Sequence, residues 1–356
     1  MEVSSILINW YNQNKRQLPW RSTSDPYIVW VSEIILQQTR VDQGLAYFNR
    51  FVARFPDVYA LASATEQEVL RNWQGLGYYS RARNMQIAAQ AIVHEFNGVF
   101  PESSGELLKL KGIGPYTASA IASICFGEAC PVVDGNVMRV IARYFGITIA
   151  VNSPEGYKAV LSAARLIIDR EHAGTFNQAI MEFGALHCTP RRPMCESCPL
   201  QSGCAAFLSH TVDTLPVKIR PAKPRDRHFN YLAILHQDEG KQPEIYLQKR
   251  TGKDIWEGMY ELPLIESPLA MEPEQLFDSP EWKTIFGGQQ LQILAYSESY
   301  RHQLTHQTIY ARFVSVQMEE PLAVSIDWQR IEVSHIRDYP IPRLIDKYFR
   351  QKKIIL

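Results

Sequence analysis

Four cysteines stand close together in the middle of the chain, with the spacing Cys188-x6-Cys195-x2-Cys198-x5-Cys204. Four thiolates in one short, loop-rich stretch can converge on a single soft metal centre. An iron–sulfur cluster and a structural zinc ion are the two candidates. Zinc sites usually contain two paired Cys-x-x-Cys knuckles, and only one such pair is present here. We therefore favour an iron–sulfur cluster, which could be purely structural.

Two carboxylates stand where acid–base chemistry could use them. Glu33 lies in the apolar stretch YIVWVSEIILQQTRV. Such a glutamate is usually solvated, but a dry pocket would raise its pKa and make it a general acid. Asp134 in VVDGNVMRV begins a predicted helix. Helix capping alone accounts for an aspartate there, and the helix dipole would also hold it ionised. One acid and one anion form the pair that glycosidic bond cleavage needs.

The stretch KLKGIGPYTA, residues 109–118, places two glycines between two predicted helices. Such a turn exposes successive backbone N–H groups, and the helix after it begins with its positive dipole end. Both features suit an anion, and a nucleic-acid phosphate is a common one. An ordinary helix-terminating glycine pair explains the same residues, so both interpretations stay open.

Length and composition bound the class of protein. The chain has 356 residues, 46% of them hydrophobic, which is enough for two domains with sizeable cores. No apolar run is long enough to span a membrane, and the first residues do not resemble an export signal. The net charge is zero, which argues mildly against a nucleic-acid partner. However, residues 211–228 are locally basic, so a basic face is not excluded.

Periodicity divides the chain into parts. Apolar residues recur at helical spacing in residues 1–187, which we predict to be nearly all-α, followed by the cysteine loop at 188–207. Residues 208–228, with prolines among basic residues, are a predicted linker. Residues 229–356 contain strand-like segments such as YLAILHQ and TIYARFVSVQM and a predicted final helix at 341–350. We predict an α+β domain there.

At these residues the chain resembles the helix-hairpin-helix DNA glycosylases that carry an iron–sulfur cluster, and within them the MutY-type adenine DNA glycosylases. The matching segments occur in the order and at the spacing of that family over about 200 residues. Besides the four-cysteine loop they are LPWR (18–21), SEIILQQTRV (32–41), GLGYYSRARN (75–84), LKGIGPYTA (110–118), VDGNVMRV (133–140) and FNQAIMEFGA (176–185).

The resemblance implies a reaction and its catalytic residues. Such enzymes flip adenine, mispaired with 8-oxoguanine or guanine, out of duplex DNA and remove it. Glu33 would protonate adenine at N7. Asp134 would stabilise, or briefly bond to, the oxocarbenium-like sugar before water attacks, and Asn136 would support that water or carboxylate. The four cysteines would hold a [4Fe-4S] cluster.

The resemblance also implies DNA contacts. Trp20 and Arg21 would line the adenine pocket. Gln38 and Tyr78 would wedge into the base stack beside the lesion, with Thr39 as a neighbouring DNA contact. The backbone amides of the turn at Gly112, Ile113 and Gly114 would hold a DNA phosphate.

Tyr116 distinguishes two enzyme classes of the same fold. Relatives of the endonuclease III type carry a lysine in the hairpin region, which attacks the sugar and forms a Schiff base. The tyrosine hydroxyl at this position cannot form an imine. We therefore expect base hydrolysis with little or no strand cleavage, from a monofunctional enzyme. A bifunctional glycosylase/lyase and a non-catalytic DNA-binding protein are the alternatives.

The C-terminal domain resembles the MutT-like, Nudix-fold domain with which this family recognises 8-oxoguanine. Active Nudix hydrolases contain a carboxylate box that binds divalent metal, and no such box follows Gly258, so we expect recognition without hydrolysis. The family's lesion-reading loop is Phe-Ser-His, whereas this chain has Leu304, Thr305 and His306. The threonine keeps a hydroxyl, and the leucine loses ring stacking. His302 and His306 could equally be ordinary strand or loop histidines.

These expectations imply partners and a location. The partner would be double-stranded DNA that contains adenine opposite 8-oxoguanine, bound by a monomer. The protein would be cytoplasmic, associated with a bacterial nucleoid, and would have no membrane partner.

Overall fold

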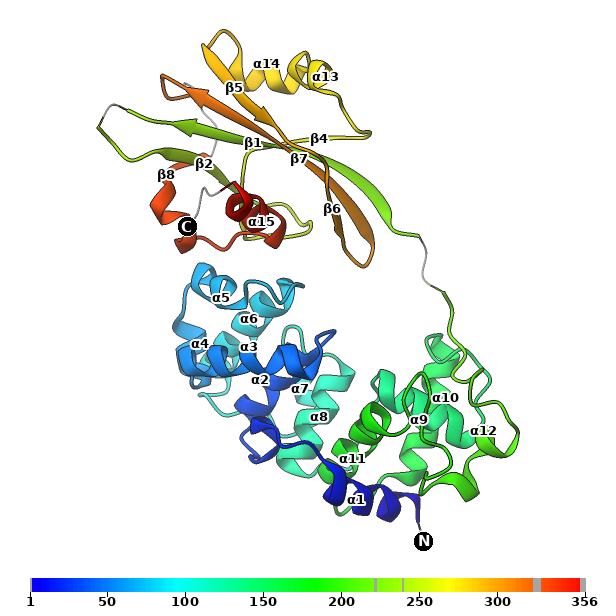
Figure 1. The fold of residues 1–356 in the computed structure, drawn as a ribbon. Helices are drawn as coiled ribbons and strands as arrows, with labels where there is room; N and C mark the ends of the chain where they lie inside the picture. The colour runs from blue at the N-terminus through cyan, green and yellow to red at the C-terminus, as the bar shows by residue number, and fades with distance from the viewer. Residues whose placement is uncertain (1, 221–222, 239, 323–327, 353–356) are drawn as a thin grey trace. The chain divides into compact units, whose positions relative to one another are not determined.

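A computed structural model describes residues 2–220, 223–238, 240–322 and 328–352. The chain forms two compact units (Figure 1). The first contains Met1–Ser63 and Asn84–Arg220, and the second contains Ala64–Arg83 and Pro221–Leu356. Within the part of the chain that the structure describes, no helix is both long and apolar enough to cross a membrane.

The described residues up to 187 are mainly helical, as the periodicity predicts, and the cysteine loop after them contains two short helices. The elements are α1 (Val3–Asn14), η1 (Pro19–Arg21), α2 (Pro26–Leu36), α3 (Val41–Arg54), α4 (Val58–Ser63), α5 (Glu66–Trp73), α6 (Ser80–Glu95), α7 (Ser104–Leu107), α8 (Pro115–Phe126), α9 (Gly135–Phe145), α10 (Pro154–Ile167), α11 (Ala173–Leu186), η2 (Gln201–Gly203) and α12 (Ala205–Leu208).

Several helices begin at a capping side chain and end at a glycine, as their sequences predict. Asp134 caps α9, and Ser153 caps α10 by accepting from the Gly156 N–H, with Pro154 in the first turn. Glycines 127 and 146 end α8 and α9 in the left-handed conformation. The first unit is held together by an apolar core in which α11 packs on α1, α8 and α9, with Phe176 and Phe183 buried at its centre.

The second unit is built on a mixed sheet. Its strands, in chain order, are β1 (Arg225–His236), β2 (Glu244–Lys249), β3 (Tyr260–Glu261), β4 (Leu264–Ser267), β5 (Leu291–Tyr296), β6 (Tyr300–Gln303), β7 (Gln307–Met318) and β8 (Trp328–Glu332). The helices are α13 (Pro273–Phe277), α14 (Pro280–Phe286), η3 (Val333–Asp338) and α15 (Arg343–Gln351).

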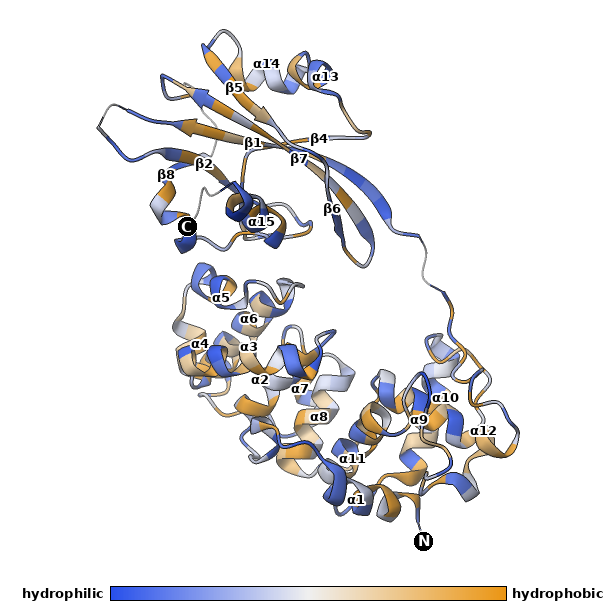
Figure 2. Cartoon of the chain, in the orientation of Figure 1, coloured by the Kyte–Doolittle hydropathy of each residue, from blue (hydrophilic) through white to orange (hydrophobic). Residues whose placement is uncertain are grey.

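The long strands β1 and β7 run parallel at the centre, from the pair Arg225 and Gln307 to the pair His236 and Met318. The order along the sheet is β3-β2-β1-β7-β5, with β4 beside β1, β6 beside β7 and β8 beside β2. All these other pairs are antiparallel. The middle of β1 is apolar (Figure 2) and buried. Such a run is expected of a strand covered on both faces.

Successive residues of β7 show how the two faces are covered. Val314 and Val316 belong to a core that includes Trp282 of α14. Phe313, which directly precedes Val314 in the strand, stacks on Tyr348 of α15 with ring centroids 3.9 Å apart. Because side chains alternate across a strand, α14 and α15 lie on opposite faces of the sheet (Figure 1).

The predicted α+β domain and its final helix are confirmed, with α15 shifted by two residues at its start and one at its end. Two differences concern the boundaries. Strand β1 already begins at Arg225, within the predicted linker at 208–228, because this residue pairs with β7. The segment Ala64–Arg83 groups with the second unit. Residues 221 and 222 of the predicted linker lie outside the described residues.

Candidate active site

The first unit contains a cavity of about 1020 Å³. It opens among η1, the end of α2, the turn before α8, the start of α9, and α11. A cavity of this size could admit a nucleobase and its sugar. Most of the predicted catalytic and base-binding residues line it, namely Trp20, Arg21, Glu33, Gln38, Thr39, Gly112, Gly114, Tyr116, Asp134 and Asn136.

Glu33 lies on α2 in the wall of this cavity and is 8% exposed. The Tyr116 hydroxyl on α8 donates a hydrogen bond to its Oε2 at 2.6 Å and also contacts the Met181 sulfur. Burial raises the pKa of Glu33 to about 7, and the nearby Asp134 carboxylate adds to this, against the Tyr116 hydrogen bond and the Arg21 charge. A carboxyl group with this pKa can carry a proton at neutral pH and still release it.

Asp134 both caps α9 and faces the cavity. Its Oδ1 accepts from the backbone N–H groups of Asn136 at 2.9 Å and Val137 at 2.7 Å, and its Oδ2 accepts from the Asn136 side chain at 2.8 Å. The expectation that capping by itself holds this group ionised needs correction. Burial raises the pKa of Asp134, and the hydrogen bonds from Val137 and Asn136 oppose that effect.

A buried arginine of α9 links this site to the cysteine loop. Arg139 donates from Nη2 to the Asn136 side-chain oxygen at 2.9 Å and from Nε to the Cys188 carbonyl oxygen at 2.7 Å. It also reaches the Gly184 carbonyl oxygen of α11 at 2.6 Å. The residue is 7% exposed, so these hydrogen bonds stabilise a guanidinium charge that is buried away from water. The sequence prediction assigned no role to it.

The four cysteines of the loop are free thiols that line one small cavity of about 30 Å³ together with Arg143. Arg143 is buried and donates to the Cys188 sulfur at 3.4 Å and to the Thr189 carbonyl oxygen at 2.8 Å. Among the described residues, no three or more His, Cys, Asp or Glu side chains form a group that could hold a metal ion. The donor set, four thiols around one pocket beside a buried cation, fits an anionic iron–sulfur cluster.

Two predicted wedge residues have strained backbones. Gln38, just after α2, has φ 58°, and Tyr78, just before α6, has φ 47°. Both side chains are exposed. Non-glycine residues rarely adopt this left-handed region, and such strain gathers at functional positions. Tyr78 belongs to the second unit, whereas Gln38 lies at the cavity of the first.

The glycine turn between α7 and α8 gives different reasons for its two glycines. Gly112 has φ 80°, and a Cβ there would approach the Asn84 side chain to 2.5 Å. Gly114 has φ −90° and caps α8, and a Cβ there would meet nothing within 4 Å. Ile113 between them is buried. The fold therefore requires glycine at 112 but not at 114, where its absent side chain leaves the backbone open to a close approach.

The predicted lesion-reading residues form the turn between β6 and β7. Thr305 and His306 are exposed there, and the Thr305 hydroxyl is hydrogen-bonded to the Tyr78 hydroxyl, which brings two predicted DNA contacts together within the second unit. The two histidines differ in setting. His302 packs against Trp256 at 5.8 Å between ring centroids, and burial, with Arg343 and Lys347, lowers its pKa.

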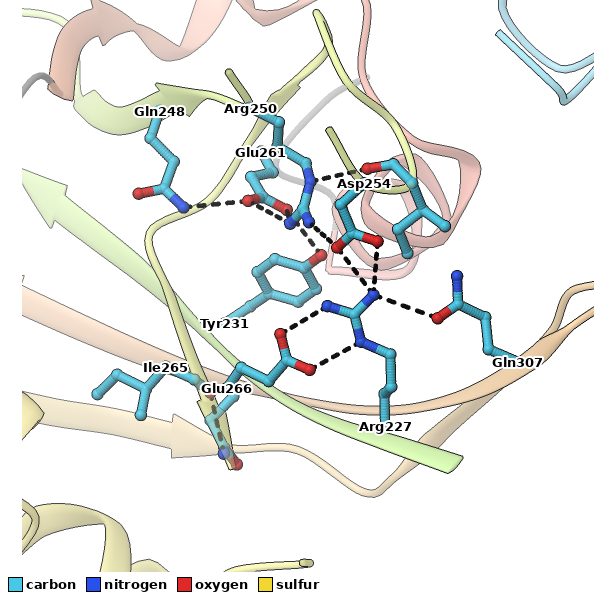
Figure 3. Close-up of polar contacts among 11 residues, drawn as sticks. Arg227, Tyr231, Gln248, Arg250, Asp254, Glu261, Ile265, Glu266 and Gln307 are labelled. Carbon is cyan, nitrogen blue, oxygen red and sulfur yellow. Dashed lines mark hydrogen bonds and ion pairs between the residues drawn. The ribbon is translucent and has the colours of Figure 1, made fainter. Parts of the chain in front are cut away.

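Carboxylates of the second unit are paired with arginines (Figure 3). Arg227 forms a two-pronged pair with Glu266 at 2.7 and 2.6 Å and reaches Asp254 at 2.9 Å. Arg250 pairs with the buried Glu261 at 2.7 and 2.9 Å. Side chains held in this way are unlike the open carboxylate set with which an enzyme binds Mg²⁺.

Two polar residues in the wall of the main cavity, one of them charged, were missed from the sequence. Glu182 of α11 is 1% exposed and accepts from the guanidinium groups of both Arg16 and Arg21. The signal was available, because Glu182 sits among Ile180, Met181 and Phe183 just as Glu33 sits among isoleucines. Gln178, which accepts from the Tyr11 hydroxyl at 2.5 Å, also lines this wall.

Known proteins resemble both units. Residues 31–163 match the model of the HhH-GPD superfamily of base excision DNA repair proteins, and residues 230–351 match the NUDIX domain. Among solved structures, a thermostable thymine-DNA glycosylase has a TM-score of 0.54 and 28% identity, covering 58% of this chain and 95% of that one. Endonuclease III bound non-covalently to DNA has a TM-score of 0.50 at 22% identity, covering 58% and 94%, which shows the helical fold.

Relatives that are similar in sequence identify the family more narrowly than the domain matches do. The adenine DNA glycosylase of Buchnera aphidicola subsp. Schizaphis graminum (strain Sg) is 35% identical over 267 residues, or 75% of this chain and 76% of that protein. The adenine DNA glycosylase of Homo sapiens is 44% identical over 209 residues, 56% of this chain and 38% of the human protein. The chain therefore belongs to the adenine DNA glycosylase family of HhH-GPD base excision repair enzymes.

Proposed function

We propose that this DNA glycosylase removes adenine that is mispaired with 8-oxoguanine, or with guanine, in duplex DNA. The observation that carries the proposal is the pair formed by Glu33 and Asp134 in one cavity. One carboxyl group is buried with a pKa near neutrality, and the other is held by a helix N-terminus beside it. Removal of adenine needs an acid for the base and an anion for the sugar.

In the proposed reaction, the adenine is extruded into the cavity and Glu33 donates its proton to N7. The C1′–N9 bond then breaks, its electron pair leaves with the base, and positive charge develops on the sugar. Asp134 stabilises that charge, with Asn136 fixing the orientation of its Oδ2. Water attacks C1′ and gives its proton to the Glu33 carboxylate that the first step left ionised, which leaves an abasic site.

Tyr116 makes the proposed enzyme monofunctional. Its hydroxyl is engaged with Glu33 and cannot form the imine through which a lysine would cut the strand. Its role is to orient the Glu33 carboxyl group and to close that side of the pocket. Trp20, which is buried against Phe48 at 4.9 Å between ring centroids, would form another wall, with Arg21 beside it.

The remaining predicted contacts would bind the duplex. The backbone at Gly112, Ile113 and Gly114 would hold a phosphate, which the open surface at Gly114 permits. Gln38 and Tyr78 would enter the stack beside the lesion, with Thr39 as a neighbouring DNA contact, and the turn residues Thr305 and His306 would contact the 8-oxoguanine. The bases for this are the exposure of the Gln38, Tyr78, Thr305 and His306 side chains and the hydrogen bond between Tyr78 and Thr305.

We further propose that Cys188, Cys195, Cys198 and Cys204 hold a [4Fe-4S] cluster, which would brace the loop that packs on α9. Arg143 would donate to the Cys188 sulfur in the loaded protein. Anaerobically purified protein should be yellow-brown and contain about four iron atoms per chain. A colourless protein with stoichiometric zinc would overturn this assignment. We propose that the enzyme works as a monomer on chromosomal DNA in a bacterial cytoplasm.

The test uses a duplex with adenine opposite 8-oxoguanine, incubated with protein, with half of each sample then treated with alkali. We expect strand breaks only after alkali. Breaks without alkali that borohydride traps as a covalent complex would favour a lyase, and no base loss would favour a non-catalytic binding protein.

The Glu33→Gln variant should bind this duplex and release adenine about 10²- to 10⁴-fold more slowly, the range expected for loss of a general acid. Glu95→Gln is the matched control, because Glu95 is exposed at the end of α6. Substantial residual turnover in Glu33→Gln would sink the acid role of Glu33.

A further inference from the structure

Glu182 is the most heavily hydrogen-bonded carboxylate in the wall of the main cavity. Arg16 donates to it from its backbone N–H at 3.0 Å, from Nε at 2.8 Å and from Nη2 at 2.6 Å. Arg21 donates from Nη1 at 2.8 Å and from Nη2 at 2.7 Å. Two guanidinium forks thus grip one carboxylate, a geometry that fixes the orientation of both arginines.

This carboxylate is an anion throughout the range in which the enzyme could work. Burial by itself would raise its pKa, but the hydrogen bonds from Arg21 and Arg16 bring the pKa of Glu182 down to about 2. Its charge therefore offsets part of the charge of two cations. Without it, the wall of the cavity would present two uncompensated guanidinium groups.

The charge in this wall reaches the proposed acid. Arg21 lowers the pKa of Glu33, while burial and Asp134 raise it and the Tyr116 hydrogen bond also lowers it. Any change that strengthens the positive field of Arg21 favours the ionised, inactive form of Glu33.

Three other titratable groups act on Glu33, Glu182 or their arginine partners, or are acted on by them. Burial raises the pKa of the Tyr11 hydroxyl, which stays protonated, and Arg21 and Glu182 modify that shift. Asp42 of α3 also lines the cavity and acts on Arg16. Burial raises the pKa of the Cys125 thiol, on α8, to about 12, so it is neutral as well. Glu182 is thus the carboxylate that both arginines contact directly.

We propose that Glu182 is a positioning residue for adenine release. It holds the guanidinium groups of Arg16 and Arg21 in one orientation in the wall of the base pocket, and it offsets their charge so that Glu33 keeps its proton. The proposal rests on the proposed function, because it concerns the acid of that reaction. It adds a residue that acts through its neighbours and not on the substrate.

The decisive variant is Glu182→Gln. A glutamine carries no charge, and its amide NH₂ group cannot accept from a guanidinium, so each arginine loses its hydrogen bond to the oxygen that the NH₂ group replaces. Single-turnover adenine release from the 8-oxoguanine:adenine duplex should be measured between pH 5.5 and pH 9. We expect the maximal rate to fall by up to about tenfold. The alkaline limb, which is the decline of the rate at high pH, should move to lower pH by on the order of one unit.

Two further variants make the result specific. Glu182→Asp keeps the charge, so it should restore the alkaline limb towards that of the wild type even if its maximal rate stays low. Arg16→Gln removes one cation, so it should move the limb to higher pH, opposite to Glu182→Gln. The exposed Glu171→Gln variant is the control and should change neither quantity.

A purely structural Glu182 would give a different pattern. Glu182→Gln would then lower the melting temperature and the maximal rate, with the limb unchanged, and that result would overturn the proposal. Limb shifts of the same sign in Glu182→Gln and Arg16→Gln would overturn it as well. If Glu182→Gln fails to fold, the Arg16→Gln limb decides: a shift to higher pH supports the proposal, and an unchanged limb rejects it.

Failure of this inference is distinguishable from failure of the proposed function. Wild-type protein that releases no adenine from the duplex contradicts the function itself. Wild-type protein that is active, with a limb near pH 7 that does not respond to these substitutions, contradicts only the role of Glu182.

Discussion

Two walls of the main cavity carry buried glutamates with opposite acid strengths. On α2, Glu33 has a pKa of about 7, and on α11, Glu182 has a pKa of about 2. Burial raises both values. The partners differ, because Glu33 receives a hydrogen bond from the neutral Tyr116 hydroxyl and Glu182 is held by two guanidinium groups. Burial therefore does not by itself make a carboxyl group an acid catalyst, and the charge of its neighbours decides.

The second unit repeats the pattern of Glu182. Its buried Glu261 accepts hydrogen bonds from Arg250. In the same cluster, Arg227 donates hydrogen bonds to Glu266 and Asp254 (Figure 3). Carboxylates paired in this way serve the architecture of the domain. That the second unit recognises DNA without hydrolysing a nucleotide stays a prediction.

After Glu33→Gln, the largest effect should come from the loss of the Asp134 charge, which lines the same cavity. Asp134→Asn removes the anion that would stabilise the sugar, so adenine release should fall about 10²- to 10³-fold. Asparagine caps helices as well as aspartate does, so the variant should keep nearly all its stability. Single-turnover kinetics and a thermal melt measure the two quantities. A loss of stability that parallels the loss of rate would mean that Asp134 is only a helix cap.

The stability of the protein should depend on pH in opposite senses for the two walls. The folded state holds the Glu33 proton up to about pH 7, whereas the unfolded state loses it near pH 4.5, so Glu33 lowers stability as the pH rises between these values. Glu33→Gln should match the wild type at pH 4.5 and exceed it at pH 8 by up to about 3 kcal/mol. Urea unfolding at both values tests this.

The opposite sign applies to Glu182. Its pKa is lowered in the folded state, so its charge contributes stability above about pH 4.5, and this contribution is lost as the pH falls towards 2. Glu182→Gln should therefore be least stable, relative to the wild type, at neutral pH.

A stability difference for Glu33→Gln that is the same at pH 4.5 and pH 8 would contradict the assignment of a raised pKa to Glu33.

A smaller effect should follow from removal of the Tyr116 hydroxyl, which donates a hydrogen bond to Glu33. The Tyr116 hydrogen bond lowers the pKa of Glu33, so Tyr116→Phe should raise that pKa and move the alkaline limb of adenine release to higher pH by on the order of one unit. The limb is measured as for Glu182→Gln, which should move it the other way. A limb that stays at the wild-type value would show that the hydrogen bond does not tune this acid.

Local sequence was enough to predict much of the site. The isoleucines around Glu33 indicated a dry pocket as the alternative to a solvated glutamate, and the position of Asp134 before a helix predicted its capping role, because both depend on residues a few positions away. The helix periodicity of the first part and the strand pattern of the second were sufficient for the fold class. The start of β1 was missed because its pairing partner at Gln307 is distant in sequence.

The residue types determined what chemistry is available: carboxyl groups in apolar surroundings, a tyrosine in place of a reactive lysine, and four thiols in one loop. The tertiary structure alone decided which carboxyl group keeps a proton. Tyr116 and Glu33 are 83 positions apart, and Arg16 and Glu182 are 166 apart. The acid strength of a buried group depends on the charges that packing brings beside it, and those charges come from distant parts of the chain.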